Sequence, residues 1–348
     1  MKLSDAAEYL RTYNGRELRL MEVCGTHTAG IRQNGIPSML SEKIHLVTGP
    51  GCPVCVTVTQ YIDRLTELSQ DDRNVIVTFG DLLRVPGSSI SLEQARSRGA
   101  DIRYVYSPMD VLRLADEDKD HDYIFAAVGF ETTAPVYAAL LAGAEEEKTD
   151  NLRLLTSLKI MPEAIKRVSD GIDGFLAPGH VAVITGTGDY RELAQKLGIP
   201  FVISGFEGEE LIAALYALVL LAEKGDAVCL NMYTRAVSDQ GNEKAREAVD
   251  RFFTGGDAAW RGLGVIPGSG LYLREEYGKY DQGSRDITQD KEPAGCRCSD
   301  VITGRLTSLD CPLYGKICTP EHPVGACMVS AEGSCFNTYR NMNISEQK

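Results

Sequence analysis

The stretch Thr48-Gly-Pro-Gly-Cys-Pro-Val-Cys55 lies where a predicted buried strand passes into a predicted helix. The strand is expected over 44–48, which is largely apolar and β-branched, and the helix over 57–69. The Gly-Pro-Gly segment ends the strand and lets the backbone approach a ligand closely. Thiols at such a turn lie near a helix N-terminus, where the helix dipole favours the thiolate. We therefore interpret Cys52 and Cys55 as a reactive pair rather than as small buried turn residues.

A second thiol follows another predicted strand, over 18–23, in the sequence Cys24-Gly-Thr-His27. A histidine after a turn often has only a surface or capping role. Because His27 stands three residues from a thiol at a strand end, the pattern favours a ligand or an acid–base group.

Carboxylates occupy the same position after two further strands. Asp81 follows a strand predicted over 74–79, and Glu131 follows a nearly all-apolar strand over 123–128. Asp81 is equally well explained as a turn cap, whereas the Gly-Phe-Glu sequence around Glu131 is typical of a binding loop.

Strands and helices alternate at βαβ spacing up to about residue 223, which predicts two α/β lobes with parallel sheets. We place the lobes at 16–122 and 123–228. Residues 229–348, together with 1–15, form a smaller, irregular, Cys-rich domain. Ligands of open α/β sheets collect beyond the carboxyl ends of the strands. The polar and thiol side chains at these ends therefore predict one cleft between the lobes.

Composition excludes several classes of function. The 348-residue chain has a formal net charge of -13, which argues against a nucleic-acid binder. Its longest apolar run, 211–222, is interrupted by Tyr216 and is shorter than the roughly 20 residues of a membrane span. The first residues lack the features of a signal peptide, so we expect a cytoplasmic protein without a membrane partner.

The chain has ten cysteines, and six of them crowd its last part. Cys229 stands alone in an apolar segment and is expected in the core. The tail lacks the paired knuckles of a zinc ribbon. Wide, irregular spacing suits an iron–sulfur cluster with four cysteine ligands, and disulfides are the alternative. The best-spaced set is Cys298, Cys311, Cys318 and Cys335, with Cys296 and Cys327 left over; spacing does not decide which four of the six bind.

Four motifs resemble the HypD family of [NiFe]-hydrogenase maturation factors, and the resemblance runs essentially from end to end. The motifs are Cys24-Gly-Thr-His27, Gly49-Pro-Gly-Cys-Pro-Val-Cys55, Gly129-Phe-Glu-Thr-Thr-Ala-Pro135, and the tail Cys311-Pro-Leu-Tyr-Gly-Lys-Ile-Cys318 with Gly325-Ala-Cys-Met-Val-Ser-Ala-Glu-Gly-Ser-Cys335.

The resemblance implies two Rossmann-like, doubly wound lobes and a smaller domain with a [4Fe–4S] cluster. It implies a scaffold for assembly of the Fe(CN)2(CO) moiety of the hydrogenase active site. The implied partners are a HypC-type small chaperone and a HypE-type cyanide donor, with HypF upstream. Carried over by motif, Cys24, Cys52 and Cys55 handle the iron.

The same resemblance places His27, Asp81 and Glu131 around the iron site. Low-spin iron with cyanide and CO is soft, so thiolates are suitable ligands. We hypothesise that Cys52 and Cys55 cycle between dithiol and disulfide, with electrons from the tail cluster. The alternative function is a stand-alone [4Fe–4S]-dependent thiol–disulfide oxidoreductase with Cys52 and Cys55 as its catalytic pair.

Overall fold

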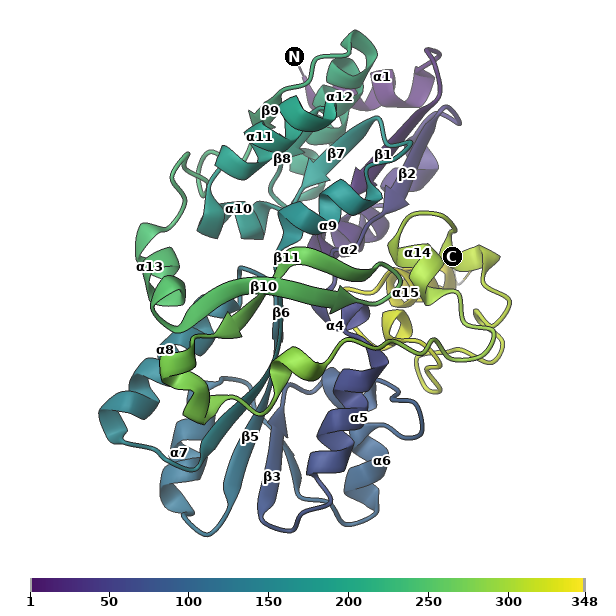
Figure 1. Ribbon diagram of the computed structural model, residues 1–348. Coiled ribbons are helices and arrows are strands. Elements are labelled where there is room, and N and C mark those ends of the chain that lie inside the picture. The colour runs from purple at the N-terminus through teal and green to yellow at the C-terminus, as the bar shows by residue number, and fades with distance from the viewer. Residues whose placement is uncertain (1, 347–348) are drawn as a thin grey trace.

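Two separate β-sheets, each flanked by helices, form the body of the protein (Figure 1). The computed structural model describes residues 2–346. All neighbouring strands of the first sheet, sheet A, are parallel. In spatial order they are β2 (Ile44–Thr48), β1 (Leu18–Glu22), β7 (Gly174–Ala177), β8 (Phe201–Ile203) and β9 (Cys229–Asn231).

The second sheet, sheet B, has a parallel half and an antiparallel half. Its strands β6, β5, β3 and β4 are parallel neighbours, whereas β11 pairs antiparallel with both β6 and β10. In spatial order they are β10 (Phe253–Trp260), β11 (Gly264–Leu273), β6 (Leu152–Lys159), β5 (Asp122–Gly129), β3 (Asn74–Thr78) and β4 (Ile102–Tyr104).

The helices largely follow the strands in alternation, as parallel sheets require. They are α1 (Leu3–Thr12), α2 (Gly25–Gln33), α3 (Ile36–Met39), α4 (Pro53–Val56), α5 (Thr59–Leu68), α6 (Leu92–Ser97), α7 (Met109–Glu117), α8 (Ala134–Glu147), α9 (Met161–Val168), α10 (Gly179–Thr185), α11 (Gly188–Leu197), α12 (Gly208–Lys224), α13 (Glu243–Phe252), α14 (Cys298–Ile302) and α15 (Ser334–Glu346). Short 3-10 turns are η1 (Leu82–Arg84), η2 (Glu275–Tyr280), η3 (Ser284–Asp286), η4 (Ser308–Asp310) and η5 (Ala326–Met328).

The core explains why these segments form parallel strands. From Tyr123 to Gly129, every residue of β5 is buried, as expected for a strand covered by helices on both faces. Each fully buried Leu or Phe side chain contributes about 1.5–3 kcal/mol relative to an exposed one. The mixed α/β fold with parallel-dominated sheets and a separate Cys-rich region confirms the predicted fold class.

The sheets are not made of the contiguous segments 16–122 and 123–228. Strands β1 and β2 of the first segment lie in sheet A, but β3 and β4 lie in sheet B. The second segment is divided in the same way, with β5 and β6 in sheet B and β7 and β8 in sheet A. The apolar pattern of a strand shows that it is buried but does not identify its neighbour, so the crossings between the sheets were not visible in the sequence.

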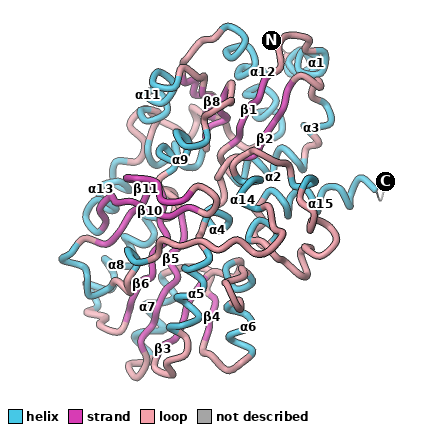
Figure 2. The backbone as a smooth tube through the Cα atoms, turned by 45° about the vertical axis from the view of Figure 1, so that its right-hand side comes forward, coloured by secondary structure: helices cyan, strands magenta, loops and turns pink. Residues whose placement is uncertain are grey.

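The chain crosses between the sheets at the waist of the molecule, where the carboxyl ends of β2 and β6 lead into α4 and α9 (Figure 1). The long β10–β11 hairpin also runs across this waist. The Cys-rich tail packs beside it, and both views place α14 and α15 next to α2 (Figure 2). Within residues 2–346, no helix combines the length and the apolar character that a membrane crossing needs.

Candidate functional site

The Cys24 loop and the Cys52 loop are in direct backbone contact. They follow β1 and β2, which are adjacent parallel strands paired in register from Leu18 with Ile44 to Glu22 with Thr48. The Gly25 N–H donates to the Gly51 carbonyl at 3.0 Å. A Cβ atom on Gly51 would collide with the backbone nitrogen of Cys24, so this approach requires glycine.

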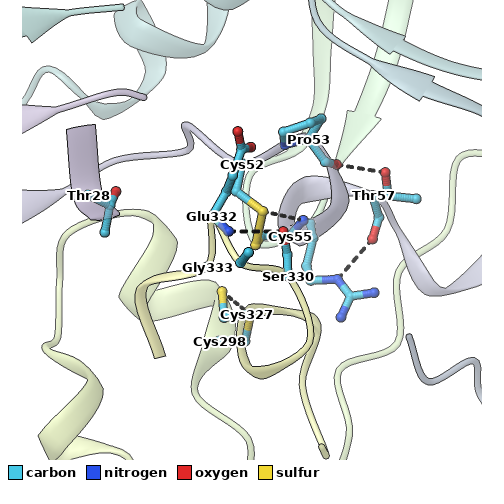
Figure 3. Close-up of a disulfide and its surroundings, with 12 residues drawn as sticks. Thr28, Cys52, Pro53, Cys55, Thr57, Cys298, Cys327, Ser330, Glu332 and Gly333 are labelled. Carbon is cyan, nitrogen blue, oxygen red and sulfur yellow. Dashed lines mark hydrogen bonds between the residues drawn. A yellow bond between two sulfur atoms is a disulfide. The ribbon is translucent and has the colours of Figure 1, made fainter. Parts of the chain in front are cut away.

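Cys52 and Cys55 form a disulfide at the start of α4 (Figure 3). Their Cα atoms are 5.2 Å apart, and the Cys55 N–H donates to the Cys52 Sγ at 3.1 Å. Both side chains are buried. The short helix begins with Pro53, which suits a first helical turn because its missing N–H would have no partner there.

Cys24 is a free, buried thiol beside this disulfide loop, and its side chain is 7% exposed. It caps α2 through its carbonyl, which accepts from the Thr28 N–H at 3.0 Å. Burial raises the pKa of Cys24 to about 12, and the negative charges of Glu332 and Glu22 act in the same direction. The thiol is therefore protonated at neutral pH unless a cation replaces its proton.

Glu22 is a functional candidate that the sequence interpretation missed. It is buried in β1, and its carboxyl group accepts from Thr28 Oγ1 at 2.6 Å and from the Cys24 N–H at 3.2 Å. Burial raises the pKa of Glu22 to about 8, despite these hydrogen bonds. Its signal in the sequence was a single carboxylate within an otherwise apolar strand end, Leu20-Met-Glu-Val23.

Glu332, also missed, packs against the Cys24 loop and interacts electrostatically with Cys24 and with the predicted site residue Asp81. Its side chain packs directly against Gly25, where any Cβ atom would collide with it. Burial raises the pKa of Glu332 to about 7, and the Asp81 charge contributes to this rise. Figure 3 shows Glu332 beside Cys52. Glu332 belongs to the irregular tail, so no periodic pattern could place it at this site.

His27 is fully buried but faces away from the thiol chemistry. Its Nε2 lies 3.1 Å from the Gly205 carbonyl, to which it donates. Its ring packs on Phe206 at 4.9 Å, and Phe206 stacks on His180 at 4.0 Å. Burial lowers the pKa of His27 to about 4, so the ring is neutral. These contacts fasten α2 to the loop after β8.

Glu131 lies at a different part of the waist. Its carboxylate accepts from the Met161 N–H at the start of α9, at 2.7 Å. Burial raises the pKa of Glu131 to about 7. The cavity that it lines contains no cysteine among its described residues. Its predicted role near the iron remains a prediction.

The six tail cysteines converge on one small cavity, although they are spread over 40 positions of irregular chain. All six thiols are free, so the structure does not support the alternative of disulfides in the tail. Cys298 Sγ lies 2.9 Å from Cys327 Sγ, and the hydrogen bonds of Cys298 with Cys296 and Cys327 lower its pKa. The lining is Cys296, Cys298, Cys311, Leu313, Tyr314, Cys318, Gly325, Cys327, Met328 and Cys335.

This donor set fits an iron–sulfur cluster in its chemistry. Buried thiols with apolar neighbours are the ligands that such clusters use. Two of the sulfurs, those of Cys298 and Cys327, are hydrogen-bonded to each other. Within residues 2–346, no group of three or more His, Cys, Asp or Glu side chains is gathered to hold a single metal ion. Cys296 and Cys327, which the spacing leaves out of the predicted ligand set, line the cavity together with the four predicted ligands.

The disulfide and the tail cysteines are neighbours. Helix α4 packs against η5, which contains Cys327, and Figure 3 shows the disulfide next to the Cys298–Cys327 pair. The buried Arg261 joins the two regions. Its N–H groups donate to the carbonyls of Val56 and Thr57 at 2.8 and 3.0 Å, and its charge lowers the pKa of Cys298.

Comparison with known proteins gives a consistent result. The family described as "HypD: Hydrogenase formation hypA family" matches residues 2–342. The chain is 39% identical over 346 residues to hydrogenase maturation factor HypD of Escherichia coli, covering 97% of this chain and 93% of that protein. It is 40% identical over 334 residues to a putative hydrogenase expression/formation protein of Methanocaldococcus jannaschii, covering 94% and 93%.

A third relative, hydrogenase maturation factor HypD of Azotobacter vinelandii, is 38% identical over 338 residues, covering 93% of this chain and 89% of that protein. All these alignments span nearly the full length of both partners, so they include the thiol loops and the Cys-rich tail alike. The chain therefore belongs to the HypD family of hydrogenase maturation factors.

Proposed function

We propose that this chain is the scaffold on which the Fe(CN)2(CO) moiety of a [NiFe]-hydrogenase is assembled, with Cys24 as a thiolate ligand of the iron. The observation that supports this most directly is the backbone contact between the Cys24 loop and the Cys52–Cys55 loop. Three cysteine side chains from two loops thereby come to one edge of sheet A. Thiolates suit a soft, low-spin iron better than carboxylates do.

Cys24 must lose a proton when its sulfur binds iron. Its buried position makes the free thiolate unfavourable, so the incoming cation supplies the compensating charge. The carboxyl group of Glu332 can accept the released proton, because its pKa of about 7 leaves part of it ionised at neutral pH and its charge acts on Cys24.

Cys52 and Cys55 take part in this scheme through their redox state. As a disulfide they offer no thiolate to iron. Addition of two electrons and two protons breaks the S–S bond and gives two thiols, which become ligands when they lose their protons. We propose that the pair cycles between these forms, and that iron binds to the reduced form.

The tail supplies the binding site for a [4Fe–4S] cluster, held by Cys298, Cys311, Cys318 and Cys335. A cluster bound there would supply single electrons beside the disulfide. Arg261 holds the end of α4 to the turn between β10 and β11, and α4 itself packs against η5 of the tail, so the two sulfur groups are adjacent.

We further propose that the scaffold acts in the cytoplasm with a HypC-type small chaperone and a HypE-type cyanide donor, with HypF upstream. Eight of the ten cysteines are free thiols, as a reducing compartment maintains them. The relatives are named for hydrogenase maturation or formation, which supports this function over a stand-alone thiol–disulfide oxidoreductase.

Infrared spectroscopy tests the proposal. The chain is purified anaerobically together with its HypC-type partner from cells that make the hydrogenase. We expect cyanide and CO stretching bands from iron-bound ligands. Absence of both bands from a preparation with an intact cluster would contradict the scaffold and favour the oxidoreductase.

A further inference from the structure

A cavity of about 540 Å³ lies between the two sheets, away from the thiols. The helices after β7 contribute one wall, and α8, α13 and β11 contribute the other, so both sheets form the site. Its volume is within the range of about 300–1,000 Å³ that is typical of small-molecule sites. The lining is Glu131, Ala134, Ile160, Ile184, Thr185, Asp189, Glu243, Arg246, Glu247, Val249, Asp250 and Leu271.

Glu131 offers an unpaired oxygen to this cavity. The residue is 8% exposed, and its Oε1 accepts from the Met161 N–H at 2.7 Å. Its Oε2 is buried and has no hydrogen-bond partner within residues 2–346. Most buried side-chain polar atoms have a hydrogen-bond partner, so an orphaned oxygen on a residue that lines a cavity points to a donor supplied by a ligand.

The remaining lining indicates the charge of that donor. Five carboxyl groups line the cavity together with one guanidinium, that of Arg246; Glu131 is buried, and the other four acids are exposed. Within the described part of the chain, none of these five forms an ion pair within 4.0 Å, whereas many surface carboxylates elsewhere do. Burial raises the pKa of both Glu131 and Asp189, and the charges of Arg246 and Lys166 offset only part of the rise for Asp189.

Apolar side chains form the rest of the wall. Ile160, Val249 and Leu271 lie among the acids, and the Ile160 N–H donates to Ser269 at 2.8 Å, which holds this wall to β11. Mixed apolar and carboxylate walls suit an organic cation with an apolar body. A divalent metal would need several oxygens converging on one point, and no such group is gathered among residues 2–346.

We propose that this cavity binds a small organic cation, with a guanidinium or ammonium group that donates to Glu131 Oε2 and faces Asp189. The apolar part of the ligand lies against Ile160 and Leu271. Because the two walls belong to different sheets, the bound cation holds them together. The site is separate from both groups of thiols, since no cysteine is among its lining residues.

Calorimetric titration of the full chain tests the proposal with n-butylguanidinium, n-butylammonium and the neutral n-butylurea. We expect at least one of the cations to bind at least tenfold more tightly than n-butylurea. Glu131→Gln should weaken cation binding at least tenfold. The matched control Glu163→Gln removes a carboxylate of α9 that is ion-paired to Lys166 outside the cavity, and it should bind as the wild type does.

Equal affinity for the neutral and the charged ligands would overturn the proposal, and so would cation binding that Glu131→Gln leaves unchanged. Absence of binding to the wild-type chain, or binding of Mg²⁺ without either organic cation, would also overturn it. If Glu131→Gln does not fold, as judged by circular dichroism, Asp189→Asn takes its place and must show the same loss.

Discussion

The two groups of cysteines in this chain are positioned by different means. Cys24 and Cys52 stand at the ends of adjacent parallel strands, and the register of β1 with β2 brings their loops together. The six tail cysteines lie in a segment of turns and short helices, with little regular hydrogen bonding between its parts. The first thiol site is positioned by the strands of sheet A. The second site lies within a segment that has little regular secondary structure.

Because they are positioned differently, the Cys24–Cys52 site and the tail site should respond differently to perturbation. The sheet-borne thiols keep their positions as long as β1 and β2 pair, whatever is bound to them. The tail has few periodic elements, so its order depends more on what its thiols hold. The largest predicted effects therefore concern loss of the cluster, and the smallest concern the disulfide.

Removal of the proposed cluster should loosen the tail while it leaves the sheets intact. We expect anaerobic oxidation with a chelator to accelerate amide hydrogen exchange over 296–340 about 100-fold, which corresponds to roughly 3 kcal/mol of local stability. Exchange in β1, β2 and β5 should change much less. Mass spectrometry of peptides measures both regions in one experiment. Unchanged exchange in the tail would show that the order of the tail does not depend on a cluster.

Gly51→Ala should destabilise the protein by roughly 2–3 kcal/mol, because the new Cβ atom would collide with the backbone at Cys24. The matched control is Gly80→Ala, a strand-end glycine after β3 where a Cβ atom meets no atom within 4 Å. Urea denaturation of both variants gives the free energies. Equal losses of unfolding free energy in Gly51→Ala and Gly80→Ala would show that the contact between the two cysteine loops is not close.

The buried His27 should make stability depend on pH. Its folded pKa of about 4 lies below its ordinary 6.5, so the unfolded chain binds the proton more readily between these values. The neutral ring contributes on the order of 2–3 kcal/mol to the free energy of unfolding. This contribution is present above pH 6.5 and is lost as the pH falls from 6.5 to 4. Denaturation curves of wild type and His27→Gln across this window measure the difference. The same pH slope in both proteins would contradict the assignment of a buried neutral ring.

Reduction of the Cys52–Cys55 disulfide should have the smallest effect on stability. The bond closes a loop of only three residues' separation, for which the chain-entropy relation gives about 2 kcal/mol at most. We expect the Cys52→Ser, Cys55→Ser double variant to unfold at a slightly lower urea concentration. The slope of its unfolding free energy against urea should equal that of the wild type. Peptide mass mapping after mild oxidation of the wild type should find the crosslink, and two persistent free thiols would count against reversible pairing.

Much of the sheet-borne site was predictable from the sequence. The strand 44–48 has the predicted bounds, because its apolar residues and the turn residues that follow mark it locally. Cys24, Cys52 and Asp81 follow the strand ends as predicted. The glycines of Gly49-Pro-Gly51 allow the close approach that joins the first two loops.

Other features depend on contacts that no local pattern records. The hairpin of β10 and β11 contains Gly255, Gly256 and Gly270, which weaken any strand signal, and its pairing with β6 is supplied by tertiary structure. The division of strands between two sheets is equally non-local. Glu332 reaches Cys24 only because the tail folds back onto α2.

In the proposed function, Cys24 holds the iron fragment and the tail holds a separate cluster. Infrared and visible spectra of Cys24→Ala, purified anaerobically with its HypC-type partner, test it most directly. The control is Cys229→Ala, which removes a thiol that lies in β9, outside both cysteine groups. We predict that Cys24→Ala loses the cyanide and CO bands and keeps the cluster absorbance, while the control keeps both. Retention of the bands in Cys24→Ala, or loss of both signals together, would contradict the account.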